Sequence, residues 1–111
     1  RMAFVRKKVA SYKWPVKVQS PSPDSAGKFD IETFDAVFKR LNRSTINELA
    51  EAGDVDLLES CVLDWEGMEE EDGSIIPCNK KNKAEFIDDP YWSKAVITAL
   101  LESLEGAKAK N

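Results

Sequence analysis

The sequence contains no histidine and only two cysteines. Histidine is the usual general base near neutral pH and the commonest metal ligand, so catalysis here would have to rest on carboxylates, lysines or a thiol. Cys61 lies in an apolar helical stripe, which favours a buried structural thiol, and Cys78 follows Pro77 in a predicted loop. We therefore expect no enzymatic activity, no metal and no cofactor.

Long hydrophobic runs are also missing. No apolar segment of the sequence is long enough for a secretory signal or a membrane-spanning helix, so we expect a soluble protein with reduced thiols in a cytoplasmic compartment. A chain of 111 residues is near the commonest size for one domain, and such a domain buries roughly two-thirds of its unfolded surface. We predict a single domain over residues 1–111, with flexible tails at residues 1–9 and 106–111.

Charge of one sign is absent from two long stretches. Residues 1–18 contain basic side chains and no acid, whereas residues 44–79 contain acids and no lysine or arginine. The net charge of -4 and the acidic middle would repel phosphate, which argues against a nucleic-acid partner. We interpret each of these two charged stretches as solvated surface.

The acidic stretch "DWEGMEEEDGSIIP", residues 64–77, has the wrong spacing for a calcium loop, and the sequence contains no glycine-rich phosphate motif. Asp64 and Glu66 flank Trp65, and neighbours on a helix point about 100° apart, so they do not form a carboxylate pair. We interpret the stretch as a connector. A helix stops at Gly67, a turn has Asp72 and Gly73 at its tip, and Met68 pairs with Ile75 or Ile76 across it.

The first part of the chain has the period of strands. "SYKWPVKV" alternates between apolar and basic residues, and Pro15 cannot donate a ladder hydrogen bond, which favours a sheet edge or a bulge. A second extended segment, "KFDIETFDAVFKRL", changes phase near Glu32 and Thr33, which suggests a bulge or an interruption of the strand. Together these segments predict a long antiparallel hairpin.

From Ser44 onward the period becomes helical. Ser44 or Thr45 is the predicted cap of a first helix that ends at Gly53, and a second helix is predicted from Asp54 to Gly67. A weak helical segment follows near residues 79–88. Asp89 and Pro90 then begin the last helix. The predicted class is α+β, an N-terminal antiparallel hairpin or small sheet followed by three to four helices. The predicted core contains Trp14, Val16, Phe34, Phe38, Leu58, Val62, Trp65, Val96, Leu100 and Leu101.

The order of these parts resembles the tail assembly chaperones of long-tailed, non-contractile phages and prophages. The matching pieces are "YKWPVKV", "FKRL" followed by "STINEL", "DLLESCVLDWEGMEEEDGSIIP", "DPYWSKAVITALLESL" and the closing "GAKAKN". The likeness covers nearly the whole chain. Its most specific element is a Trp-x-Gly sequence followed by an acidic turn, a glycine and an apolar-proline step.

The resemblance implies a non-enzymatic protein of the host bacterial cytoplasm that is not in the mature virion. Such a chaperone binds the tape-measure protein and helps to recruit the major tail-tube protein during tail morphogenesis. The family also suggests a longer product made by ribosomal frameshifting near Lys110 and Asn111. Two alternatives remain: a structural tail-terminator or connector component of the virion, and an acidic regulatory binding protein.

The predicted partner-binding residues lie at the connector and at the start of the last helix. They are Met68, Ile76, Tyr91 and Trp92. A chaperone must present apolar surface, and residues near loops are the least committed to the core. For Trp92, packing in the core is the competing expectation.

Overall fold

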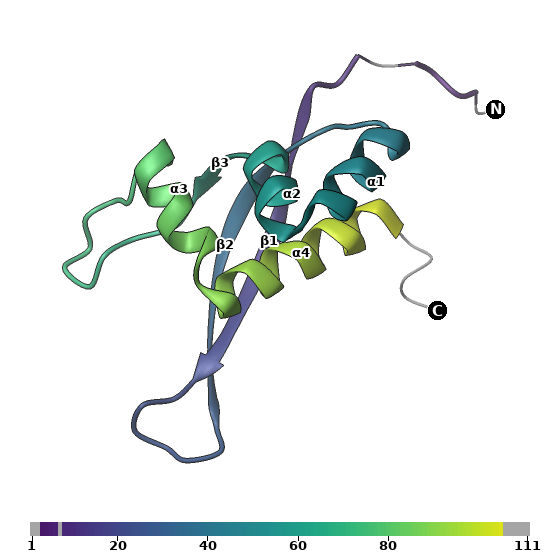
Figure 1. Cartoon of the computed structure of the whole chain (residues 1–111). Helices are drawn as coiled ribbons and strands as arrows, with labels where there is room; N and C mark the ends of the chain where they lie inside the picture. Colours follow the sequence, from purple (N-terminus) through teal and green to yellow (C-terminus); the bar gives the residue numbers. More distant parts are fainter. Residues whose placement is uncertain (1–2, 7, 106–111) are drawn as a thin grey trace.

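The computed structural model describes residues 3–6 and 8–105. Within them, the chain forms a three-stranded antiparallel sheet of order β1-β2-β3 and four helices (Figure 1). The elements are β1 (Ser11–Pro21), β2 (Phe29–Lys39), α1 (Arg43–Ala52), α2 (Asp54–Cys61), β3 (Val62–Glu66), α3 (Lys80–Ile87) and α4 (Pro90–Glu105). The predicted α+β class, with its N-terminal hairpin followed by helices, is confirmed.

The tails predicted at residues 1–9 and 106–111 are only partly covered. Residues 3–6, 8 and 9 have no regular structure and are exposed, and the rest of these tails lies outside the described residues. Among the described helices, none combines the length and the apolar character that a membrane span requires.

The strands β1 and β2 form the predicted hairpin, in register from Ser11 opposite Lys39 to Pro21 opposite Phe29. Val16 is fully buried, whereas Lys13 on the other face is exposed, as the alternation predicted. Strand β1 is the sheet edge, where a proline costs no ladder hydrogen bond on its open side. The prediction for Pro15 is therefore confirmed.

The bulge or interruption predicted near Glu32 is wrong. The pairing of β1 with β2 runs without a shift, with Glu32 opposite Val18 and Thr33 opposite Lys17. Phe34, Ala36 and Phe38 are buried on one face, whereas Phe29 lies on the opposite face and is 60% exposed. The phase change therefore marks apolar residues on both faces of a regular strand.

The helix predicted from Asp54 to Gly67 is also wrong in its second half. Helix α2 ends at Cys61, and the chain continues as β3, paired with β2. The register shifts between Val37 and Phe38, which face Asp64 and Val62, so that Leu63 is left over as a bulge. The bulge lets Val62 and Trp65, three positions apart, both face the core.

Besides the end of α2, the start of α1 also differs from the predicted signals, whereas the start of α4 follows them. Helix α1 begins at Arg43 after Asn42, and no side chain caps it, so the predicted cap at Ser44 or Thr45 is wrong. Gly53 separates α1 from α2 with a φ of 129°, a backbone conformation that side chains rarely adopt. At α4, the Asp89 carboxylate accepts hydrogen bonds from the amides of Tyr91 and Trp92, at 2.9 and 3.4 Å. This confirms Asp89 as the cap.

The buried side chains form one cluster between the sheet and the helices. Eight predicted core residues belong to it: Val16, Phe34, Phe38, Leu58, Val62, Trp65, Val96 and Leu100. Trp14 is only partly buried against this cluster. Leu101 is 52% exposed, because the helical turn directs Leu100 into the core and its neighbour away from it.

Candidate binding site

The four predicted partner-binding residues come together around one pocket of about 210 Å³, here called the acidic pocket. It lies between the connector, the long hairpin and the junction of α3 with α4. Met68 and Ile76 are each 8% exposed and Trp92 is 4% exposed, whereas Tyr91 is 44% exposed. Three of the four therefore belong to the core beneath the pocket, and only Tyr91 offers substantial apolar surface.

Trp65 fixes the connector against β3. Its indole Nε1 donates a hydrogen bond to the carbonyl oxygen of Ile76 at 2.8 Å. The amide of Ile76 donates in turn to the carbonyl of Met68 at 2.9 Å, and Glu69 pairs with Ile75. The predicted small hairpin across the connector is therefore confirmed.

The tip of the connector is a local turn. The Asp72 carboxylate accepts hydrogen bonds from the Ser74 amide at 2.9 Å and from the Ser74 hydroxyl at 2.7 Å. These hydrogen bonds favour the charged form and lower the pKa of Asp72. Gly73 has a φ of 88°, as the predicted Asp-Gly turn requires.

An aromatic cluster forms the inner wall of the acidic pocket. The ring of Trp92 stacks on Phe34 with centroids 5.9 Å apart and an interplanar angle of 7°. The ring centroid of Phe86 lies 5.7 Å from that of Trp92. Trp65 packs edge to face against Trp92, with centroids 5.9 Å apart. Within the described residues, the buried Nε1 of Trp92 has no hydrogen-bond partner, unlike that of Trp65.

Among residues 3–6 and 8–105, the charged side chains that line the acidic pocket all carry the same sign. They are Glu32, Glu69 and Asp89. Carboxylates beside aromatic faces attract cations, through both their charge and the negative face of the rings. The chemistry of this pocket therefore suits a basic side chain attached to an apolar segment.

Tyr91 also borders a larger groove of about 620 Å³ between β1 and α4, here called the lysine groove. Its charged residues are Lys17 and Lys94, and its apolar lining includes Pro21, Phe29 and Tyr91. Sequence analysis missed Phe29 and both lysines as site residues. The out-of-phase position of Phe29 in β2 was a signal that could have identified it.

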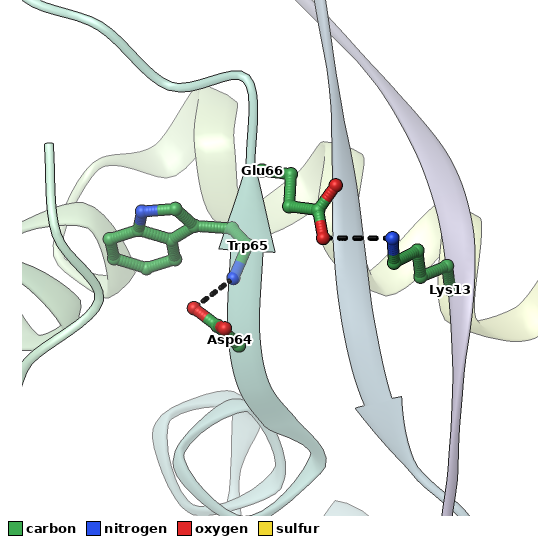
Figure 2. A network of polar contacts seen from close by, with 4 residues as sticks. All are labelled: Lys13, Asp64, Trp65 and Glu66. Atoms are coloured by element: carbon green, nitrogen blue, oxygen red, sulfur yellow. Dashed lines mark hydrogen bonds and ion pairs between the residues drawn. The ribbon is translucent and has the colours of Figure 1, made fainter. Parts of the chain in front are cut away.

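Asp64 and Glu66 point at different partners (Figure 2). Glu66 forms an ion pair with Lys13 across the sheet at 2.8 Å, and this contact raises the pKa of Lys13. The Asp64 carboxylate accepts a hydrogen bond from the backbone amide of Trp65 at 2.8 Å. Both carboxylates are thus engaged in contacts within or across the sheet. No three acidic or cysteine side chains in the described part of the chain gather into a group that could hold a metal ion.

The two thiols should differ in reactivity. Cys61 is buried, and burial raises its pKa; Cys78 is partly exposed, although burial and the nearby Asp64 also raise its pKa. Because the exposed thiolate is the reactive species, we expect a thiol reagent to modify Cys78 first and Cys61 only after unfolding. Kinetics with a chromogenic disulfide reagent would measure this. A fast-reacting thiol that persists in Cys78→Ser would contradict it.

No protein-family model, curated protein or solved structure matches this chain.

Proposed function

We propose that this protein is a non-enzymatic tail assembly chaperone of a long-tailed phage or prophage. Its partner in this proposal is the tape-measure protein, a long helical chain that it keeps soluble in the host cytoplasm until the tail-tube protein encloses it. The sequence resemblance motivates the proposal. The structural observation that supports it is the lysine groove, where Phe29 and Tyr91 present exposed apolar surface beside two cations.

The lysine groove suits one face of an amphipathic helix. Such a helix carries an apolar stripe with polar and charged residues along its edges, and it binds by laying that stripe into a hydrophobic groove. Phe29 from β2 and Tyr91 from α4 would contact the stripe. Lys17 and Lys94 would pair with acidic residues at its edges, which sets orientation more than affinity.

Recruitment of the tail-tube protein is the second half of the proposed function. The resemblance assigns that contact to a longer, frameshifted product, so it adds no site on the described residues. The four side chains predicted for partner binding have different roles in the proposal. Tyr91 contacts the partner, whereas Met68, Ile76 and Trp92 belong to the core beneath the acidic pocket.

The experiment is a titration of helical fragments of the proposed tape-measure partner into the purified protein. Tyr91→Ala combined with Phe29→Ala should weaken binding by about tenfold or more. The reason is that truncating an aromatic residue that anchors an interface costs more than about 1 kcal/mol of binding free energy. Lys94→Glu should reduce the association rate and its dependence on salt. Calorimetry and stopped-flow fluorescence measure the two effects.

The matched control is Leu104→Ala, because Leu104 is an exposed apolar residue near the other end of α4. It should leave binding unchanged. Equal loss in Leu104→Ala and in the double variant would move the site away from the lysine groove. Recovery of the protein in stoichiometric amount from purified particles would instead support the structural virion component.

A further inference from the structure

The acidic pocket brings together carboxylates from three separate parts of the chain. Glu32 comes from β2, Glu69 from the connector and Asp89 from the junction of α3 with α4. Asp89 is already engaged, because its carboxylate accepts the amide hydrogen bonds at the start of α4. Glu32 and Glu69 are exposed, and within the described residues neither takes part in an ion pair. The pocket therefore presents two carboxylates that are available to a ligand.

The wall of the acidic pocket also contains a hydrogen-bond donor without a partner. Trp92 lines the pocket and is 4% exposed, and its Nε1 has no acceptor among the described residues. An indole nitrogen can only donate, and a buried donor without an acceptor costs free energy. This donor points to a ligand that brings an oxygen acceptor as well as positive charge. A residue of a polypeptide chain has both when its side chain is basic, because its main-chain carbonyl accepts.

Two other cavities of the described chain lack this combination. The lysine groove presents Lys17 and Lys94, which repel a cation. A shallow pocket between α2 and α3 contains Glu59, Glu85 and Asp88 but has no aromatic residue. Carboxylates and aromatic rings thus occur together in the acidic pocket and not in these two cavities.

The size and the walls of the acidic pocket favour one arginine side chain. Its volume of about 210 Å³ is below the roughly 300–1,000 Å³ of sites for whole small molecules, so it suits a single side chain. The aromatic wall of Phe34, Phe86 and Trp92 favours arginine over lysine. A planar guanidinium stacks on aromatic rings, is less strongly hydrated than an ammonium group and pairs with carboxylates through two parallel hydrogen bonds.

We propose that the acidic pocket binds one arginine side chain of a protein partner. The guanidinium pairs with Glu32 and Glu69, and the main-chain carbonyl of the partner accepts from Nε1 of Trp92. Tyr91 borders both this pocket and the lysine groove, so the arginine fixes the direction in which a segment lies across Tyr91. The identity of the protein that presents the arginine rests on the function proposed above, whereas the pocket itself does not.

The test is a titration of the full chain with N-acetyl-arginine amide, followed by the indole N–H signals in nitrogen-15 NMR spectra. The chain has three tryptophans, and Trp92→Phe assigns the signal of Trp92. That signal should shift in a saturable manner, whereas the signal of Trp65, whose Nε1 already has an acceptor, should move less. N-acetyl-citrulline amide has the same shape without the charge, and it should bind at least about tenfold more weakly, because hydrogen bonds between charged groups are the stronger ones.

Matched variants separate the acidic pocket from the general charge of the protein. Glu32→Gln combined with Glu69→Gln should weaken binding of N-acetyl-arginine amide by about tenfold, because the guanidinium loses both charged acceptors. Glu59→Gln combined with Glu85→Gln makes the same change of charge in the pocket without aromatic residues and should have no effect. Circular dichroism checks that each variant is folded. Equal binding of the arginine and citrulline probes, equal losses in the two double variants, or no saturable shift of the Trp92 signal would each overturn the proposal.

The same probe distinguishes this proposal from the proposed function. If N-acetyl-arginine amide binds and the helical tape-measure fragments do not, the arginine pocket stands and the proposed partner is wrong. If the fragments bind and the probe does not, the arginine pocket is wrong and the proposed partner stands.

Discussion

Replacing Trp65 by alanine is expected to lower the free energy of unfolding by about 3–5 kcal/mol, the cost of removing a large buried aromatic side chain. Trp65 is buried, and its ring meets Phe86 and Trp92 edge to face at 5.6 and 5.9 Å. Its indole also holds the connector through the carbonyl of Ile76. Urea denaturation followed by circular dichroism measures the change.

Two conservative variants separate the hydrogen bond of Trp65 from its packing. Trp65→Phe leaves the buried carbonyl of Ile76 without its donor, which adds about 1–3 kcal/mol to the packing loss. Trp92→Phe removes an Nε1 that has no partner, so it loses packing alone. We expect Trp65→Phe to be the more destabilising of the two. Equal effects would show that the contact with Ile76 contributes nothing to stability.

Replacing Phe38 by alanine is the second large effect, again about 3–5 kcal/mol. Phe38 is fully buried in β2, and its ring meets Tyr12 edge to face with centroids 5.8 Å apart. It also lies at the register shift, opposite Val62. A cavity at this point would loosen both neighbouring strands, and thermal unfolding would record the loss.

The control for Phe38 comes from the same strand. Phe29→Ala changes the same type of side chain, but on the exposed face of β2, so its effect on stability should stay within about 0.5 kcal/mol. Phe29→Ala should therefore affect partner binding without destabilising the protein. Similar losses of stability in the two variants would contradict the assignment of Phe29 and Phe38 to opposite faces.

The sequence alone determined those features that depend on local rules. Pro15 restricted its strand to an edge or a bulge because proline lacks an amide hydrogen, and the structure places that strand at the edge. Asp89 and Pro90 marked the start of α4 because the cap and the first helical position have distinct chemical requirements. The turn at Asp72 and Gly73 was predicted by a local rule of the same kind. Sequence also selected four residues that line one pocket, since they flank connections whose positions these rules predict.

The tertiary structure decided what depends on a partner segment. A three-residue spacing such as that of Val62 and Trp65 suits a helix, yet a bulged strand satisfies it equally once β2 is available for pairing. Burial was decided in the same way: Leu101 and Phe29 are exposed, whereas Met68 and Ile76 are buried. Apolar character gives each side chain a preference for the interior, but which residues reach it depends on the surfaces that pack together. The acidic pocket and the lysine groove exist only where those surfaces meet, so their opposite charges could not be read from the order of residues.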